Sequence, residues 1–371
     1  MKIAIDIRDA AGEKTGKGIY AFGLINNILK LDQENHYLLY TDSEKNPFQN
    51  HKNVTLKVIA KKGLRWHLEV LKHLKIEKPD LFFAPTSYII PSLAPKFLKV
   101  IITVHDLVAF LMPGNHNAKA VLIERLTLKR ALKKATQVFV VSNNTKNDLQ
   151  KMFKYPSPQI QCIPCAPSED FHSEISQKKI EAVRKKHQLP EKFILGVGTL
   201  EPRKNFPSLI KSFIIVKKKH PEYKLVIVGK KGWKYEEIFQ LIKQHKLEEE
   251  VIFPGYLNNE ELKAFYHLAT LFVFPSLYEG FGIPPLEAMS SGCPVISSNV
   301  ASLPEVIGDA GLLIDPKSTN KIAESIISLL ENDQIRTMLI ERGFRRAQKF
   351  SWENSAQAAL EAFKSQKDLS V

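Results

Sequence analysis

Short strand-like runs alternate with helical stretches along almost the whole chain, and this alternation constrains the fold more than any other feature. The first series of strand-like runs covers residues 2–7, 36–41, 54–59, 80–84, 100–103 and 137–141. Helical patterns separate most of these runs, for example at 64–74, 119–135 and 144–152. Such alternation is typical of a parallel sheet with helices on both faces.

A second series of the same kind follows a stretch that is rich in proline and charge. Its strand-like runs cover residues 193–197, 224–228, 251–253, 271–274 and 294–296. Breakers and charges cluster where few core contacts cross, so residues 173–190 are predicted to form a linker. A length of 371 residues also suggests two domains. We expect an α/β protein with two Rossmann-like domains, at 1–172 and 191–350, whose parallel sheets face a central cleft.

One more amphipathic helix is predicted at the end of the chain, over residues 351–368. Ser351 is its expected N-cap. Apolar side chains recur along it at helical spacing, so one of its faces needs a packing partner. The residues themselves leave open which domain supplies that partner.

The composition excludes several other classes of protein. A hydrophobic content of 44% without low-complexity tracts argues against disordered and fibrous chains. No apolar run is long enough for a membrane span, and Asp6 and Arg8 interrupt the N-terminal run where a signal peptide needs its apolar core. Three cysteines are too few for a disulfide framework. We therefore expect the protein in the cytoplasm.

The formal net charge of +14 raises the question of an anionic partner. Nucleic acid is not expected, because no base-stacking aromatic residues interleave the lysines and no known binding module appears. Two basic helical stretches, at 61–75 and 119–134, combine apolar residues with lysines and arginines. In the first stretch, one face carries Leu64, Leu68, Leu71 and Leu74. Such helices can lie reversibly on anionic lipid, here on the inner face of the membrane. A core-facing apolar stripe with solvated lysines is the alternative.

Two cations follow the first strand-like run of the second series, in the motif V-G-T-L-E-P-R-K-N. Arg203 and Lys204 lie just past the end of the run, and Asn205 is the predicted N-cap of the next helix. Free N–H groups and the helix dipole favour anions at such a place. The motif indicates a diphosphate site, with a solvated Arg-Lys pair at a turn as the alternative.

A second motif, F-P-S-L-Y-E-G-F-G-I-P-P-L-E, follows a buried strand-like run. Gly280 and Gly282 would let backbone N–H groups approach a ligand closely. Glu279 lies in the loop and Glu287 lies one turn into the next helix, at the edge where open α/β sheets bind ligands. Carboxylates beside a phosphate site suit sugar hydroxyls. Otherwise Glu279 would be a solvated loop residue and Glu287 a favourable first-turn acid.

Taken together, these motifs resemble those of the retaining glycosyltransferases of family 4, which have the GT-B fold. The resemblance is carried by E-G-F-G-I-P-P-L-E, by G-T-L-E-P-R-K-N before it and by S-L-P-E-V-I-G-D-A-G-L-L after it. The segments T-V-H-D-L and F-S-W-E extend it over essentially the whole chain. The cation-bearing motif, G-T-L-E-P-R-K-N, resembles the mannosyltransferase-like branch of the family.

The resemblance implies roles for individual residues. Glu279 would contact the donor sugar and His105, after the run at 100–103, would lie at the transferred sugar, which makes both candidate catalytic residues. Glu287 would bind the nucleotide ribose, while Arg203 and Lys204 would hold the diphosphate. The closing helix would pack back on the first domain. The candidate donor-binding residues are Gly16, Gly18, Thr199, Arg203, Lys204, Gly280, Phe281, Gly282, Ile283 and Glu287.

The implied activity is the transfer of a hexose, preferably mannose, from a nucleotide-diphosphate sugar to a glycan or lipid-linked glycan, with retention. No metal and no cofactor besides the sugar nucleotide are expected, because Arg203, Lys204 and a helix N-terminus can neutralise the leaving diphosphate. Alanine at Glu279 or His105 should lower turnover and leave nucleotide affinity nearly unchanged. A nucleotide-sugar-binding protein without catalysis is the competing possibility.

Some features depart from the family or point elsewhere. Many family members carry arginine where this chain has Thr199, so fewer cations would support the phosphates. The run T-G-K-G-I-Y-A imitates a dinucleotide fingerprint, as in an NAD-dependent Rossmann enzyme. However, residues 8–15 separate Gly16 from the first strand-like run, whereas a cofactor turn follows its strand tightly. Cys162 and Cys165 resemble half of a zinc site but lack a second pair of ligands.

Overall fold

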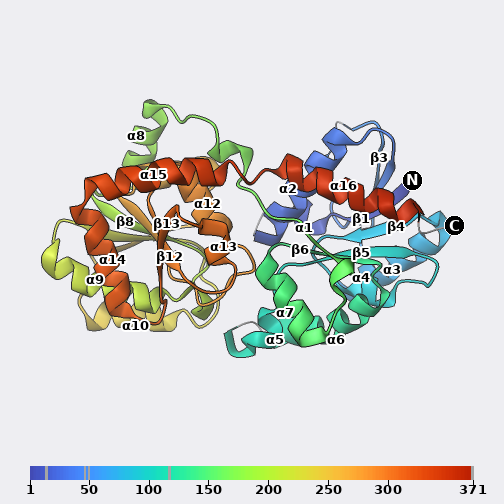
Figure 1. The fold of residues 1–371 in the computed structure, drawn as a ribbon, viewed down its shortest axis with the longest axis horizontal. Coiled ribbons are helices and arrows are strands. Elements are labelled where there is room, and N and C mark those ends of the chain that lie inside the picture. Colours follow the sequence, from blue (N-terminus) through green and yellow to red (C-terminus); the bar gives the residue numbers. More distant parts are fainter. Residues whose placement is uncertain (13–15, 46, 49–50, 116–117, 369–371) are drawn as a thin grey trace. The chain divides into compact units, whose positions relative to one another are not determined.

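The computed structural model describes residues 1–12, 16–45, 47–48, 51–115 and 118–368 (Figure 1). The chain divides into two compact units, Met1–Ala166 with Ser351–Val371, and Pro167–Phe350. Each unit has a parallel sheet and a hydrophobic core of its own. The prediction of an α/β protein built from two parallel-sheet domains is thereby confirmed.

The first unit, within the described residues, is built on a seven-stranded parallel sheet with the strand order β3-β2-β1-β4-β5-β6-β7. Its strands are β1 (Lys2–Asp6), β2 (His36–Thr41), β3 (Val54–Val58), β4 (Leu81–Ala84), β5 (Lys99–Val104), β6 (Gln137–Val140) and β7 (Ile160–Cys162). Every residue of β4 is buried, as expected for a central strand that is covered on both faces.

Helices cover both faces of this sheet (Figure 1). They are α1 (Arg8–Ala11), α2 (Gly16–Leu31), α3 (Gly63–Glu77), α4 (Ile89–Leu93), α5 (Val108–Leu111), α6 (Ala118–Lys134), α7 (Asn143–Phe153) and α16 (Trp352–Asp368), with short 3₁₀ turns η1 (Pro113–Asn115) and η2 (Ser157–Gln159). The helices α3, α4 and α6 share one core with the strands, in which Trp66, Leu74 and Leu128 are fully buried.

The C-terminal helix α16 belongs to the first unit and packs along α2. Gly23 makes this contact possible, because a Cβ atom there would lie only 2.4 Å from Cε2 of Trp352. Tyr20 meets the same indole edge-on, with ring centroids 5.9 Å apart. Further along the helix, Phe363 packs on Phe83 of β4. The apolar face of the C-terminal helix is thus buried against the first unit, as the family resemblance implies.

The second unit contains, in the described part of the chain, a six-stranded parallel sheet with the order β10-β9-β8-β11-β12-β13. Its strands are β8 (Phe193–Val197), β9 (Lys224–Val228), β10 (Val251–Gly255), β11 (Leu271–Phe274), β12 (Val295–Ser298) and β13 (Gly311–Ile314). Its helices are α8 (Gln177–Lys186), α9 (Phe206–Lys219), α10 (Glu236–Gln244), α11 (Asn259–Leu268), α12 (Ile283–Ser290), α13 (Leu303–Ile307), α14 (Thr319–Glu331) and α15 (Asp333–Ala347), with the 3₁₀ turns η3 (Glu169–Phe171) and η4 (Pro202–Lys204). None of the helices that the structure describes is long and apolar enough to span a membrane.

Residues 173–190, which the sequence analysis assigns to a linker, are instead an integral part of the second unit. Ile180 and Val183 of α8 are buried, and α8 packs on α11. The ammonium group of Lys263, on α11, donates to the Asp170 carbonyl oxygen at 2.6 Å and so ties the preceding segment down. Although α8 is mostly polar, Ile180 and Val183 are three positions apart and lie on the same side of the helix, and their burial attaches it to the unit. The boundary between the units lies at residues 166–167, not at 172–173.

Candidate functional site

The two cation- and carboxylate-bearing motifs meet at the carboxyl ends of neighbouring strands. Strand β8 leads into η4, and β11 leads into the loop at residues 275–282. Because β8 and β11 are paired in the sheet, the segments that follow them lie together. The Leu277 amide donates to the Arg203 carbonyl oxygen at 2.8 Å, which locks the two loops in register.

Asn205 holds this corner together, although not as the expected capping side chain. Its backbone lies in the left-handed region, with φ of 58°, at the N-cap position of α9. Its side-chain amide donates to the carbonyl oxygens of Pro275, at 3.0 Å, and Pro316, at 2.7 Å. The amide oxygen accepts a hydrogen bond from Ser208. The side chain thus connects three loops instead of capping the helix.

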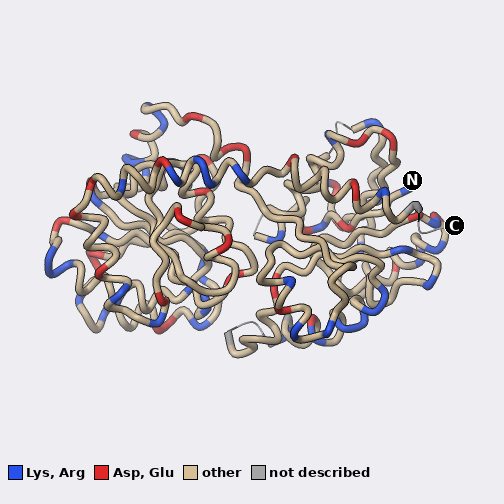
Figure 2. Tube along the Cα trace, in the orientation of Figure 1, with Lys and Arg blue, Asp and Glu red and all other residues tan. Residues whose placement is uncertain are grey.

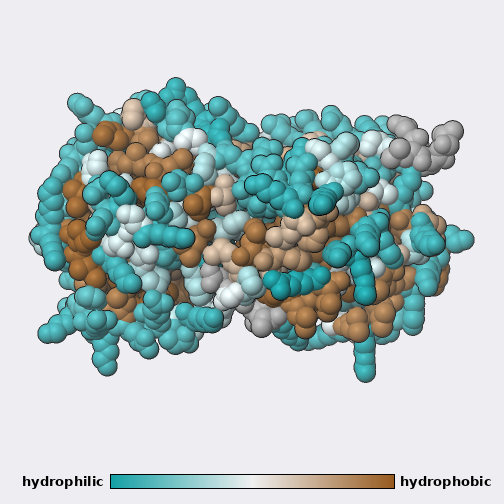
Figure 3. Space-filling model, turned by 60° about the horizontal axis from the view of Figure 1, so that its bottom comes forward, coloured by the Kyte–Doolittle hydropathy of each residue, from teal (hydrophilic) through white to brown (hydrophobic). Residues whose placement is uncertain are grey.

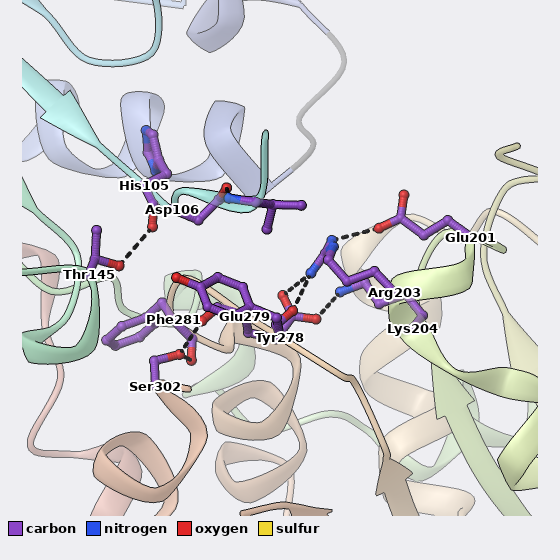
Figure 4. A network of polar contacts seen from close by, with 11 residues as sticks. His105, Asp106, Thr145, Glu201, Arg203, Lys204, Tyr278, Glu279, Phe281 and Ser302 are labelled. Carbon is purple, nitrogen blue, oxygen red and sulfur yellow. Dashed lines mark hydrogen bonds and ion pairs between the residues drawn. The ribbon is translucent and has the colours of Figure 1, made fainter. Parts of the chain in front are cut away.

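A cluster of buried charges forms the centre of the site (Figure 4). The Glu279 carboxylate lies between Arg203 Nη1, at 2.6 Å, and Lys204 Nζ, at 2.7 Å. The other terminal nitrogen of Arg203 pairs with Glu201 at 2.6 Å. Glu201 and Glu279 are only 5% and 8% exposed. Glu279 is therefore not a solvated loop residue, and the Arg-Lys pair is not a solvated turn.

The charges in this cluster stabilise one another strongly. Burial opposes ionisation of Glu279, but Arg203 and Lys204 outweigh it and lower the pKa of Glu279 to about 2. Burial lowers the pKa of Lys204, and the pairing with Glu279 opposes that effect. The Lys204 ammonium also lies 4.8 Å from the ring centroid of Phe274, a cation–π contact. Two cations are thus kept in place at the strand ends by carboxylates.

The glycine-containing loop between β11 and α12 is fixed from beneath by one serine. The Ser302 hydroxyl lies 2.9 Å from the Glu279 carbonyl oxygen and 2.6 Å from that of Phe281 (Figure 4). Gly282 has φ of 122°, a conformation that side-chain-bearing residues rarely adopt, and a Cβ atom there would lie 2.8 Å from Leu303. Gly280 and Phe281 lie in the loop just before this turn, and Ile283 is the first residue of α12.

Glu287 lies inside α12 and is only 6% exposed. The Tyr266 hydroxyl donates to its carboxylate at 3.3 Å. Burial raises the pKa of Glu287 to about 7, and the bond from Tyr266 opposes this only in part. A surface acid that merely favours the first turn of a helix would be solvated, so that alternative is wrong. The Glu287 carboxyl group is therefore a buried hydrogen-bond acceptor whose pKa is about 7.

Thr199 is exposed in the loop that follows β8. The neighbouring loops approach each other backbone to backbone, since a Cβ atom at Gly229 would lie 2.0 Å from the Gly198 carbonyl oxygen. At Gly198 itself, a Cβ atom would lie 3.2 Å from Cδ of Lys204. These glycines therefore leave room for the stem of Lys204 to cross the loop toward Glu279.

In the first unit, His105 directly follows β5 and is 7% exposed. Its Nε2 atom donates to the Pro85 carbonyl oxygen at 2.7 Å, which leaves Nδ1 as an acceptor. Tyr20 packs edge-on against the imidazole at 4.8 Å. Burial lowers the pKa of His105 to about 4, so the ring is neutral at physiological pH. The Asp106 carboxylate accepts a hydrogen bond from the Val108 amide at 3.0 Å.

The structure brings Arg203, Lys204 and Glu279 into direct contact. Thr199 lies in the loop after β8, and Glu287 lies inside α12, where its partner is Tyr266. Gly16 and Gly18 lie at the start of α2 in the first unit, with α1 between β1 and that helix. They do not form the tight strand-to-helix turn of a dinucleotide site. Residues 13–15 of that motif lie outside the described residues.

Three residues of the site carry no role in the sequence analysis: Glu201, Tyr266 and Ser302. Glu201 belongs to the cation-bearing motif, so an acid two positions before an arginine was a usable signal. Tyr266 lies in the middle of an ordinary amphipathic helix and gives no such signal.

Comparison with known proteins identifies both halves of the chain. A family model described as Glycosyltransferase Family 4 matches residues 18–168, and one described as Glycosyl transferases group 1 matches residues 178–346. The chain is 33% identical over 292 residues to O-antigen chain mannosyltransferase B of Escherichia coli, a match that covers 78% of this chain and 76% of the relative. It is 32% identical over 273 residues to the serotype-specific mannosyltransferase WbdA of Escherichia coli, covering 71% of this chain but 33% of that relative.

Solved structures show the same fold. Sucrose-phosphate synthase from Thermosynechococcus elongatus superimposes with a TM-score of 0.79 at 21% identity, over 100% of both chains. The Anabaena protein Alr3699/HepE, solved in complex with UDP and glucose, has a TM-score of 0.79 at 20% identity, over 98% of this chain and 100% of that one. The chain belongs to the family 4 glycosyltransferases, which have the GT-B fold, and within them to the mannosyltransferase-like branch.

Proposed function

We propose that this glycosyltransferase moves a hexose, with mannose favoured, from a nucleotide-diphosphate sugar to a glycan or lipid-linked glycan acceptor. The proposal includes retention at the anomeric carbon, independence of metal ions and a cytoplasmic site of action. The observation that supports it best is the buried cluster of Arg203, Lys204 and Glu279 at the strand ends of the second unit.

The two cations suit the diphosphate of the donor. In this structure their charges are compensated by Glu201 and Glu279. A diphosphate offers more oxygen acceptors and more charge than one carboxylate, so it can replace Glu279 as a partner of Arg203 and Lys204. Glu279 is then released toward the hydroxyl groups of the sugar. Donor binding would therefore exchange one anion for another and would leave the Glu279 carboxylate as an acceptor for sugar hydroxyls.

Glu287 suits the ribose of the nucleotide. Vicinal hydroxyls donate two hydrogen bonds to a carboxylate, and they favour its ionised form over the neutral form that burial favours. Tyr266 holds one carboxylate oxygen and so restricts the orientation of the group. Because burial raises the pKa of Glu287 to about 7, nucleotide binding below neutral pH should release a proton.

His105 would act on the transferred sugar as a neutral imidazole. Its Nε2 atom is occupied by Pro85, so Nδ1 is the atom that can accept a hydrogen bond from a sugar hydroxyl. Such a contact contributes to the rate where it is stronger in the transition state than in the ground state. Retention is the stereochemical course that the resemblance to the retaining enzymes of family 4 implies.

The choice of donor is supported by the relatives. Two of them are named mannosyltransferases, at 33% and 32% identity. The Anabaena structure contains UDP and glucose, and at 20% identity it supports the fold and no particular base. We therefore favour GDP-mannose over UDP-hexoses. For the leaving diphosphate, Arg203 and Lys204 supply the positive charge that a metal ion supplies elsewhere.

The direct test combines binding with turnover of the purified protein. Thermal-shift measurements with GDP, UDP and ADP should show the largest stabilisation with GDP, and a clear preference for UDP would overturn the choice of base. GDP release from GDP-mannose in the presence of a lipid-linked glycan fraction should persist in EDTA. Loss of turnover in EDTA would refute metal independence. Binding of GDP-mannose without GDP release would favour the competing possibility, a nucleotide-sugar-binding protein without catalysis.

The stereochemistry needs a separate readout. NMR of the glycosidic product from GDP-mannose should show the α-anomer, which is the configuration of the donor. A β-linked product would mean inversion and would refute the retaining course. This outcome would leave the assignments of the diphosphate and ribose sites intact.

A further inference from the structure

The outward face of α3 carries apolar side chains among its cations. Leu64 and Ile76 are 63% and 78% exposed, and Leu68 is also exposed. The basic residues on the same face are Arg65, Lys72 and Lys75. At 100° per residue, all six lie within one third of the helix circumference, opposite the buried residues Trp66, Val70 and Leu74. The predicted core-facing stripe thus applies to Leu71 and Leu74 but not to Leu64 and Leu68.

The outward face of α6 repeats this pattern more strongly. Leu122 and Leu126 are 59% and 58% exposed, and Ile123 is exposed beside them. The exposed cations of the helix are Lys119, Arg125, Lys129, Arg130, Lys133 and Lys134. The single acid of the described helix, Glu124, lies on the opposite side of the helix, between the buried residues Leu128 and Ala131, and is half-buried. Half of the helix circumference therefore presents leucine, isoleucine, lysine and arginine without any carboxylate at its centre.

These faces belong to one side of the first unit. Helix α4 contacts both α3 and α6, and all three share the core on the same face of the sheet. Between them, Leu93 at the end of α4 and Phe97 just after it are exposed, Phe97 by 55%. Figure 3 shows apolar surface crossed by hydrophilic side chains on this unit, and Figure 2 shows the basic positions along its helices. We call the outward faces of α3, α4 and α6, with Phe97, the basic apolar face.

The acids near this face are already engaged by the domain's own lysines. Glu69 pairs with Lys61 at 2.7 Å, and Glu77 pairs with Lys57 at 2.7 Å. An outward helix face in water is normally polar, and exposed apolar side chains with a cationic surround mark an interaction surface. The mixture selects a partner with an anionic surface and an apolar interior. A bilayer with anionic headgroups has both, since leucines can enter the headgroup boundary while lysines pair with phosphates.

We propose that the basic apolar face docks on the surface of an anionic lipid bilayer. The binding follows from the face alone, whereas its use in presenting a lipid-linked acceptor to the first unit rests on the proposed function. Membrane binding requires both the exposed leucines and the cations. A few inserted leucines alone bind a bilayer weakly, and the attraction between cations and headgroups is screened by salt. Docking should therefore weaken with salt and with loss of either the leucines or the cations.

The experiment is sedimentation of the full chain with phosphatidylcholine vesicles that contain, or lack, about one third phosphatidylglycerol, without any glycan acceptor. The cation variant is Lys129→Gln/Arg130→Gln/Lys133→Gln and the apolar variant is Leu122→Ser/Leu126→Ser. All five positions are exposed, so neither variant removes core packing. The matched control, Lys178→Gln/Lys211→Gln/Lys218→Gln, removes the same charge from exposed positions of the second unit.

The wild type and the control should sediment with anionic vesicles at low salt, and each face variant should bind roughly tenfold more weakly. Wild-type protein that stays in the supernatant would overturn the proposal and favour an acidic protein as partner. A control that loses binding as fully as the cation variant would also overturn it, because net charge and not this face would then control binding. Nucleotide-induced thermal shifts, measured without vesicles, show separately whether the donor site functions.

Discussion

Replacing Glu279 by glutamine should strengthen the binding of a nucleoside diphosphate while it abolishes most sugar transfer. The Glu279 carboxylate pairs with Arg203 Nη1 at 2.6 Å and with Lys204 Nζ at 2.7 Å. The diphosphate of the donor needs the same two cations. Glu279 therefore competes with the diphosphate as well as serving the sugar, which changes the sequence-based expectation that its loss leaves nucleotide affinity nearly unchanged.

The size of the effect follows from the ionisation of Glu279. Its pKa falls from 4.5 to about 2, which corresponds to about 3 kcal/mol in favour of the ionised carboxylate. Glutamine keeps the shape and loses this attraction, so the folded protein should lose about 3 kcal/mol of stability. Glu201 continues to pair with Arg203 in the variant, so the loss of Glu279 increases the affinity for the nucleotide by only part of this energy. We expect GDP to bind roughly tenfold more tightly, which is about 1.4 kcal/mol.

Calorimetric titration of GDP into the Glu279→Gln variant measures this change. The control is Glu250→Gln, which removes one negative charge from a surface pair with Lys217 in the same unit. That variant should bind GDP like the wild type. Thermal unfolding should show a lower midpoint for Glu279→Gln without GDP and a larger rise on GDP addition. Unchanged or weaker GDP binding would refute the reasoning, because Glu279 would then be organising the cations for the diphosphate.

Two further predictions concern buried titratable groups. Because the folded-state pKa of Glu287 is raised from 4.5 to about 7, its contribution to stability is full below about pH 4.5 and is lost as the pH rises through 7. Glu287→Gln should therefore be more stable than the wild type at pH 8, by about 3 kcal/mol, with equal stability near pH 4.5, and an advantage independent of pH would contradict this. His105→Ala should lower turnover roughly hundredfold with little change in GDP affinity. Because the pKa of His105 is about 4, the pH–rate profile of the wild type should show no change near pH 6.5 that is due to protonation of this residue.

Much of the fold could be predicted because its signals are local. Strand β4 reads L-F-F-A and is buried at every residue, and a short apolar run of this kind is what a doubly covered parallel strand requires. The meeting of the two motifs was also predictable, because both follow strands and all strands of a parallel sheet end at one edge. The fate of residues 173–190 was not, since Ile180 and Val183 are few among charges and their burial depends on a distant partner, α11.

The electrostatics of the site depend on distances that no linear pattern contains. Glu279 and Glu287 are both acids in one short motif, yet the pKa of the first falls to about 2 and that of the second rises to about 7. The difference arises because Glu279 pairs with two cations from η4, whereas Glu287 accepts a hydrogen bond from the uncharged Tyr266 hydroxyl of α11. In the same way, helical periodicity placed Leu64 and Leu68 with the core leucines of α3, but the helix is docked so that these two face outward.

The central claim, that Arg203 and Lys204 hold the donor diphosphate, is tested most directly by calorimetric titration of GDP into the Arg203→Gln/Lys204→Gln variant. Both substitutions remove charge and keep much of the side-chain volume, and circular dichroism checks that the variant is folded. Phosphate contacts through two charge-assisted partners should be worth roughly a hundredfold in affinity or more. The account predicts that the variant binds GDP at least that much more weakly than the wild type, whereas GDP affinity within a factor of about two of the wild type would contradict it.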